Sequence, residues 1–147
     1  NGTMAGAMDV GEGGGLGKVS LAIRESSSSI KAELTDGKPR FEIRVSCYSR
    51  VEDIVLEKGV AGYSEEFLPA IEEAQKALLQ KQIQAVVDKA IRLYGSDILF
   101  LGNRLHQAHP GVWEGLEEHW EETVKHVPIT ITVQTRADSV ELKYLPG

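Results

Sequence analysis

The sequence predicts an α+β fold in which a mostly antiparallel β-sheet carries one long amphipathic helix and two shorter helices on one face, in the order βββ-α-α-α-β. Three observations predict it. Apolar and polar residues alternate between residues 18 and 47, as in strands. Apolar residues then recur every three or four positions from residue 65 to 94, as in a helix. Alternation returns at residues 129–133.

The first part of the chain is expected to contribute little to this fold. Residues 1–17 are rich in Gly and Ala and show no periodicity. We therefore expect a cloning scar or a flexible linker there, and we place the folded domain at residues 18–147. The chain also lacks a charged-then-apolar signal region, so an exported natural protein is expected to extend further upstream.

The early strands are predicted as a hairpin. Residues 18–34 alternate in two pieces, and the serine run Ser26–Ser29 between them is either a bulge or a turn. Asp36-Gly37 is expected to reverse the chain, because glycine tolerates the positive φ that hairpin turns require. The return strand covers residues 41–47, where apolar and polar side chains alternate as in a half-buried strand.

The helical part begins after an ambiguous segment. Residues 51–63 are expected to form either a short helix-like segment or an irregular connection. The long helix is predicted over residues 65–94, with Pro69 in its first turn, where a missing N–H costs little. Gly95 is expected to end this helix.

Two shorter helices are predicted next. Ser96 or Asp97 is expected to cap one over residues 98–101, which Gly102-Asn103 would end. Another is expected to begin at Pro110 and to run to about His126.

The chain closes with a strand at residues 129–133. A turn at residues 137–139 is expected to follow, and residues 140–144 are expected to continue the strand beyond it.

Composition narrows the classes of function. The net charge of −6 argues against binding to nucleic acid, and no basic cluster suits an anionic membrane surface. No apolar run approaches the roughly 20 residues that span a bilayer, so the chain is not expected to be an integral membrane protein. The one cysteine, Cys47, excludes an intrachain disulfide and is interpreted as a buried, inert thiol. No motif predicts a cofactor.

The histidines and glutamates do not form a recognisable catalytic pattern. A zinc site needs three or four ligands at motif spacing, and His106, His109 and His119 do not supply it. We interpret these histidines as exposed or locally hydrogen-bonded. A helix with an apolar stripe on one side presents its glutamates to water, so no acid–base pair is predicted there. These glutamates are Glu114, Glu117, Glu118, Glu121 and Glu122.

The two tryptophans lie at helical spacing. Trp113 and Trp120 occur with Leu116 and Val124 at intervals of three or four residues. We interpret them as core anchors rather than as an aromatic ligand platform.

The order Asp97, Gly102, Pro110, Trp113 and Trp120, placed between a long amphipathic helix and a closing strand, resembles the C-terminal domain of the Ger(x)C family. These are the C-subunit lipoproteins of bacterial spore nutrient-germinant receptors. The early hairpin, with residues 36–39 in its turn and Phe41 in the return strand, also resembles that domain.

The resemblance implies a non-enzymatic extracytoplasmic domain that acts in spore germination. Members are lipid-anchored on the outer face of the spore inner membrane and work with integral-membrane A and B subunits. This chain has no lipobox around Cys47, so the anchor is expected upstream of it. The family has no established catalytic residues, and none is assigned.

We expect the domain to act through protein contacts. The candidate contact residues surround a segment predicted to be an irregular loop, and they are Asn103, Arg104, His106, Gln107 and His109. The alternatives are a metal-assisted hydrolase built on His106, His109 and His119, and a module that binds a small nutrient.

Overall fold

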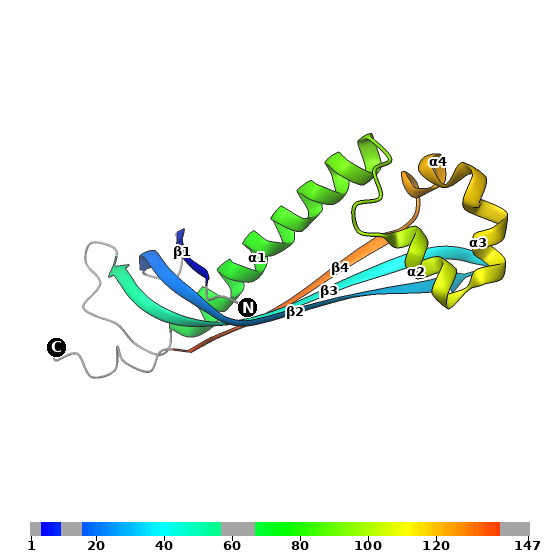
Figure 1. The fold of residues 1–147 in the computed structure, drawn as a ribbon. Helices are drawn as coiled ribbons and strands as arrows, with labels where there is room; N and C mark the ends of the chain where they lie inside the picture. Colours follow the sequence, from blue (N-terminus) through cyan, green and yellow to red (C-terminus); the bar gives the residue numbers. More distant parts are fainter. Residues whose placement is uncertain (1–3, 10–15, 57–66, 139–147) are drawn as a thin grey trace. The chain divides into compact units, whose positions relative to one another are not determined.

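The structure is a computed structural model that describes residues 4–9, 16–56 and 67–138 (Figure 1). The strands and helices follow in the order β1 (Met4–Asp9), β2 (Leu16–Thr35), β3 (Lys38–Leu56), α1 (Leu68–Val86), η2 (Val87–Leu93), α2 (Leu101–Ala108), α3 (Pro110–Leu116), η3 (Glu117–His119), α4 (Trp120–Val124) and β4 (Ile129–Asp138). The strands form one sheet in the order β1-β2-β3-β4. The predicted α+β class, with strands first, then helices and a returning strand, is confirmed.

Most of the sheet is antiparallel, as predicted. The first strand, β1, pairs antiparallel with β2, from Met4 opposite Ile23 to Asp9 opposite Lys18. Sequence analysis left residues 1–17 outside the fold, whereas Met4–Asp9 form a strand and β2 already begins at Leu16. Small residues such as Ala and Gly give little local signal for a strand, so pairing with β2 supplies what local preference does not.

The β2–β3 hairpin turns where the sequence predicts it. Asp36 and Gly37 have φ values of 53° and 76°. Two consecutive positive φ values match the type I′ turn, whose twist suits a hairpin. The strand β2 runs without interruption through Ser26–Ser29, so a turn at the serines is wrong. The four serines are exposed, and pairing within the sheet keeps them extended.

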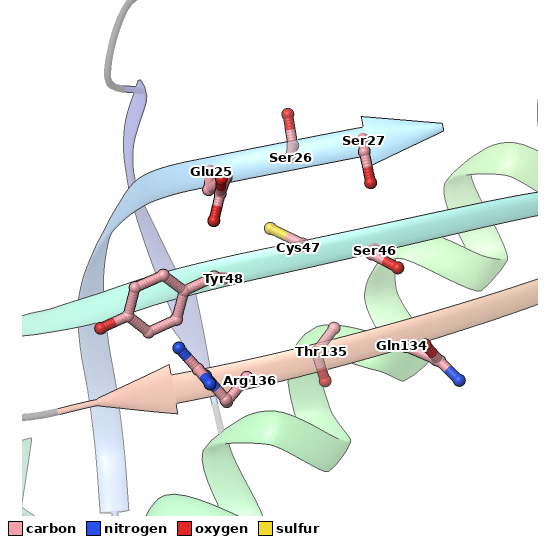
Figure 2. A pocket seen from close by; sticks show the side chains of 9 residues that line it. All are labelled: Glu25, Ser26, Ser27, Ser46, Cys47, Tyr48, Gln134, Thr135 and Arg136. Carbon is pink, nitrogen blue, oxygen red and sulfur yellow. The ribbon is translucent and has the colours of Figure 1, made fainter. Parts of the chain in front are cut away.

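The third strand is longer than predicted. It continues from Lys38 to Leu56, so neither a helix-like segment nor an irregular connection is correct for residues 51–56. The rest of that segment, residues 57–63, lies outside the described residues. The last strand, β4, runs in the same direction as β3, as the labelled residues of the two strands show in Figure 2. It contains Ala137 and Asp138, so the turn predicted to start there is wrong, and residues 140–144 are not described.

The contacts divide the chain into two compact units. Unit 1 comprises residues 1–27, 46–79 and 133–147, and unit 2 comprises residues 28–45 and 80–132. Three strands and α1 contribute to both units. Each unit has its own apolar cluster.

The cluster of unit 1 joins the first turns of α1 to the sheet. Its buried members are Leu21, Val51, Ile71 and Ala137. A buried polar group lies beside it, because Gln75 Nε2 donates to Ser49 Oγ at 2.8 Å and approaches Cys47 Sγ at 3.5 Å. The expectation that Cys47 is a buried thiol is confirmed.

Glu72 fixes α1 to β4 within unit 1. Its backbone oxygen accepts a bond from Thr135 Oγ1 at 2.6 Å, and its carboxylate accepts the Ala137 N–H at 2.9 Å. The second bond satisfies a backbone donor of a strand at the end of the sheet order.

The cluster of unit 2 is larger and joins strand β3 to the helices. Its buried members are Phe41, Ile43, Val87, Ile91, Leu101, Leu105, Trp120, Val124 and Val127. The alternation in the return strand thus places its apolar face on the core. Burial of this face is the main favourable term for the helix layer of the unit.

The predicted long helix is present but changes its winding. Leu68–Val86 is α-helical, Val87–Leu93 is π-helical, and residues 65–66 lie outside the described residues. Gly95 ends the helix as predicted, with a φ of 65°. The N–H groups of Gly95 and Ser96 donate to Ile91 O at 3.0 Å and Ala90 O at 2.8 Å.

The two shorter helices differ from the prediction. Residues 98–100 are a turn and an irregular residue, and α2 begins only at Leu101. Gly102 and Asn103, which were expected to end a helix over residues 98–101, therefore lie in the first turn of α2. The segment from Pro110 to Val124 begins at Pro110 as predicted, but it divides into α3, η3 and α4 instead of forming one helix.

Candidate functional site

Asp97 accepts three hydrogen bonds within the helix layer of unit 2. Its Oδ1 accepts the Leu101 N–H at 2.7 Å, and its Oδ2 accepts the Gly102 N–H at 2.8 Å. The same Oδ2 accepts a hydrogen bond from Trp120 Nε1 at 3.0 Å. Asp97 was predicted as a possible cap of an earlier helix, and it instead satisfies free N–H groups at the start of α2.

Gly102 provides the space for the tryptophans. A Cβ atom at this position would lie 2.8 Å from Trp120 Nε1 and 2.9 Å from two ring carbons of Trp113. The two indoles therefore pack directly against the backbone of α2. This close approach explains why a glycine occupies the first turn of α2.

An aromatic cluster surrounds this contact. Trp113 and Trp120 meet edge to face, with ring centroids 5.3 Å apart, and Phe41 meets Trp120 at 6.3 Å. His106 stacks on Trp113, with the two ring centroids 6.0 Å apart. Trp120 is buried and Trp113 is half-buried, which agrees with their interpretation as core anchors.

Further contacts fix the end of η2 and the turn after it to α4 and to the residues that follow α4. Arg92 Nη1 donates to the backbone oxygens of Lys125 at 3.1 Å and Val127 at 2.5 Å. A Cβ atom at Gly95 would lie 2.7 Å from the Glu121 backbone oxygen, so only a glycine fits there without displacement. The turn after η2 is thus fixed by close contacts with Glu121 of α4 and with Lys125 and Val127, which follow α4.

The candidate contact residues lie on a helix and not on an irregular loop. Asn103, Arg104, His106 and Gln107 are exposed on α2, whose other side is buried through Leu101, Gly102 and Leu105. The prediction of a loop failed because Gly102-Asn103 has poor helix propensity, which packing against the tryptophans overrides.

His109 lies at the junction of α2 and α3. Its N–H donates to Leu105 O at 2.7 Å, and its carbonyl accepts the N–H groups of Val112 and Trp113 at 3.1 Å each. Its backbone thus ends one helix and begins the next. His109 is only partly exposed, so it belongs less to the outer face of α2 than the other four.

The described residues give no support to a metal centre. Within residues 4–9, 16–56 and 67–138, no group of three or more His, Cys, Asp or Glu side chains is placed to hold a metal ion. His106 stacks on an indole, and His119 is exposed at the break between η3 and α4. Among the described residues, His106, His109 and His119 thus do not form the group of three ligands that a zinc site uses.

The glutamates of α3, η3 and α4 are all exposed, as expected for a solvated face. Glu122 forms a salt bridge with Lys125, with Oε1 and Nζ 2.9 Å apart. The hydrogen bond from Lys125 and its charge hold the pKa of Glu122 below its ordinary value, and the same hydrogen bond raises the pKa of Lys125.

Unit 1 contains a hollow of about 440 Å³ on the sheet (Figure 2). Its lining comes from three strands and comprises Glu25, Ser26, Ser27, Ser46, Cys47, Tyr48, Gln134, Thr135 and Arg136. The guanidinium of Arg136 lies 4.3 Å from the ring centroid of Tyr48, whose hydroxyl donates to Asp138 at 3.0 Å. Most lining side chains are exposed, and Arg136 and Tyr48 already contact each other, so the hollow has no free charged group deep inside it.

The exposed apolar segment between η2 and α2 was not predicted from the sequence. Leu93, Tyr94, Ile98 and Phe100 are all exposed, although the run Ile98–Leu101 is typical of a buried helix. Only Leu101 of that run is fully buried. No local signal in the sequence distinguishes Phe100 from Leu101, because the difference arises from the left-handed backbone of Phe100.

None of the helices in the described parts of the chain has the length and apolar content needed to cross a membrane.

Comparison with known proteins identifies relatives of the whole described region. The model of the family described as "Spore germination B3/ GerAC like, C-terminal" matches residues 2–140. Spore germination protein B3 of Bacillus subtilis (strain 168) is 27% identical over 107 residues, which make up 71% of this chain and 28% of that protein.

A crystal structure of the GerBC protein has the same fold. It matches with a TM-score of 0.71 and 22% identity, over 91% of this chain and 40% of that chain. This chain thus spans well under half the length of either relative.

Proposed function

Because this chain belongs to the family of GerAC-like C-terminal domains of spore germination proteins, we propose that it is a non-enzymatic domain that acts in germination through protein–protein contacts. The resemblance to the Ger(x)C family that the sequence suggested is confirmed. In this proposal the partners are the integral-membrane A and B subunits of a germinant receptor. A lipid anchor upstream holds the domain on the outer face of the spore inner membrane.

The observation that carries the proposal is the rigid presentation of polar side chains on α2. One side of this helix is fixed by the buried Leu101 and Leu105 and by the three hydrogen bonds of Asp97. The other side exposes Asn103, Arg104, His106 and Gln107. A fixed helix face loses little conformational entropy on binding, which favours recognition by a partner.

A charge reversal on α2 tests the proposal. Arg104→Glu in the receptor protein that carries this chain is expected to weaken co-purification with the membrane subunits and to slow germination. A repulsive charge within an interface costs about 1 kcal/mol or more, so a loss of affinity of about fivefold or greater is expected. Lys81→Glu is the matched control, because Lys81 is also an exposed cation on a helix of unit 2.

Both variants must melt at the same temperature as the parent for the comparison to count, and their exposed positions predict this. Normal assembly and normal germination of the Arg104→Glu, His106→Ala and Gln107→Ala variants together would remove α2 as the contact surface.

A further inference from the structure

An exposed apolar surface lies at the turn between η2 and α2. Leu93, Tyr94, Ile98 and Phe100 are 62%, 62%, 48% and 68% exposed. Elsewhere in the described residues, only Leu78 and Val86 are large apolar side chains with comparable exposure. Single exposed apolar residues are common on proteins, but four within one short turn form a patch of the kind that marks an interaction site. We call these four residues the turn patch.

The turn patch is held in place by hydrogen bonds. The Ile98 N–H donates to Ser96 O at 2.9 Å, and the Phe100 N–H donates to Asp97 O at 3.1 Å. Phe100 has φ 56° and ψ 42°, a left-handed conformation that disfavours residues with a Cβ atom. The N–H groups of Leu101 and Gly102, which follow Phe100, donate to the Asp97 carboxylate and maintain this conformation. In it the phenyl ring is exposed to water.

An apolar groove adjoins the turn patch within unit 2. It has a volume of about 320 Å³ and lies between the second half of α1 and strands β2 and β3. Leu99, which lies between Ile98 and Phe100, forms part of its wall, and the exposed Val86 lies at its edge. The remaining lining is almost entirely aliphatic and includes Ile30, Ile43, Val45, Ile83 and Val87.

Two carboxylates and one ammonium group lie beside the turn. Glu121 Cγ and Lys125 Cε each lie 3.0 Å from the position of a Cβ atom at Gly95, the residue that follows Tyr94. Lys125 forms a salt bridge with Glu122, so these three charges are net negative. Residues 114–125 carry five glutamates and one lysine, and all five glutamates are exposed. This charge repels an anionic lipid surface or an acidic segment and attracts a basic one.

We propose that the turn patch and the adjoining groove bind a basic amphipathic segment of a partner protein. The apolar face of that segment covers Ile98 and Phe100 and fills the groove, and its Lys or Arg side chains lie toward Glu121 beside Gly95. A helix laid into an apolar groove uses apolar residues at positions i, i+3, i+4 and i+7. This inference rests on the proposed function and specifies the chemistry of the partner.

Two synthetic peptides of about 18 residues, five helical turns, test the charge preference. Both carry leucines at the same amphipathic positions; one has Lys and the other Glu at the remaining positions. Calorimetry with this chain is expected to show binding of the lysine peptide at least about tenfold tighter than binding of the glutamate peptide. The difference is expected to shrink as salt is added, because salt screens exposed charges.

Variants locate the binding site. Phe100→Gly removes the ring and suits the left-handed backbone, so it is expected to fold normally and to weaken binding of the lysine peptide at least about tenfold. Ile98→Ser is expected to act in the same direction. Leu78→Ser is the matched control, because Leu78 is an exposed apolar residue of α1 that belongs to unit 1, and it is expected to leave binding unchanged.

Three results would overturn the inference: no binding of either peptide, equal binding of both, or binding of the lysine peptide that Phe100→Gly does not weaken. If the chain binds neither peptide but binds neutral phosphatidylcholine vesicles, and Phe100→Gly weakens that binding, the turn patch is assigned to a lipid surface instead. If Arg104→Glu disrupts receptor assembly while Phe100→Gly does not, the proposed function stands and this inference fails. If Phe100→Gly leaves assembly normal, and Arg104→Glu, His106→Ala and Gln107→Ala do so too, the proposed function fails as well.

Discussion

At the scale of single residues, the packing of unit 2 depends on the lack of a side chain at Gly102. Gly102 has no Cβ, and this allows Trp113 and Trp120 to contact the backbone of α2. Asp97 completes the arrangement, because one carboxylate satisfies two backbone donors and the indole N–H of Trp120. Four of the five residues that suggested the resemblance, Asp97, Gly102, Trp113 and Trp120, therefore form a single physical cluster, in which each residue accommodates or bonds to another.

Gly102→Ala is expected to destabilise the protein by about 1–3 kcal/mol, because the new methyl group overlaps both indoles. This cost exceeds the propensity gain of alanine over glycine, which is at most about 1 kcal/mol in a helix. Urea denaturation followed by tryptophan fluorescence measures the change.

Gly115→Ala in α3 is the matched control. A Cβ atom there would meet no other atom within 4 Å, so only the propensity gain of about 0.5–1 kcal/mol is expected, and the protein becomes more stable. If Gly102→Ala is also stabilising, the indoles do not pack as the structure describes.

The same residues show the limit of reading local sequence. The spacing of Trp113 and Trp120 predicts a shared apolar side correctly, and the burial of Trp120 agrees with it. The break of the helix at Glu117–His119 was not predictable, since the apolar spacing continues unchanged through it. Local sequence suggested that Gly102 ends a helix. The structure shows another reason for a glycine there, because the indoles of Trp113 and Trp120, distant in the sequence, leave no space for a Cβ atom.

At the scale of elements, strands and helices were predicted well where their pattern is local and poorly where a neighbour determines them. The Asp36-Gly37 turn and the alternation from Phe41 to Cys47 identified the hairpin. The continuity of β2 through Ser26–Ser29 and the pairing of β1 depend on adjacent strands, which local propensity does not encode. The exposed face of α2 was assigned to a loop for the same reason.

The ion pair of α4 gives a pH prediction. Glu122 has a pKa below its ordinary value because of Lys125, so the stability from this pair is fully present above the unfolded pKa and is lost as the pH falls through the folded pKa. Glu122→Gln is therefore expected to lower the melting temperature slightly at neutral pH, and the melting curves of variant and parent are expected to converge in acid.

The effect is small because the Glu122 side chain is 74% exposed. Glu118→Gln is the control, since it removes an equally exposed negative charge that forms no salt bridge within the described residues. A melting-temperature difference for Glu122→Gln that persists or grows in acid would exclude the ion pair as its cause.

At the scale of the whole molecule, the two units have separate apolar clusters but share continuous elements. The strands β2, β3 and β4 and the helix α1 each contribute residues to both units. Unfolding one unit therefore frays four elements of the other. We expect the chain to unfold in one cooperative transition.

Ile71→Ala tests this expectation. Ile71 is fully buried in the cluster of unit 1, and its truncation is expected to cost about 2–5 kcal/mol. Both tryptophans belong to unit 2. A cooperative chain therefore shows the same shift of the denaturation midpoint by tryptophan fluorescence as by circular dichroism.

Leu105→Ala, in the cluster of unit 2, serves as the companion variant, and a comparable shift by both methods is expected. An unchanged fluorescence midpoint in Ile71→Ala, together with a biphasic circular dichroism curve, would mean that the units unfold independently.

The parallel alignment of β4 with β3 has a consequence for how the chain folds. The β2–β3 hairpin closes through two residues, whereas the bond from the Phe41 N–H to Pro128 O joins positions separated by all the helices. Loop closure over such a distance is entropically unfavourable until the intervening chain is compact. The hairpin can therefore form early and serve as a template, and β4 joins the sheet only after the helix layer has shortened the path between them.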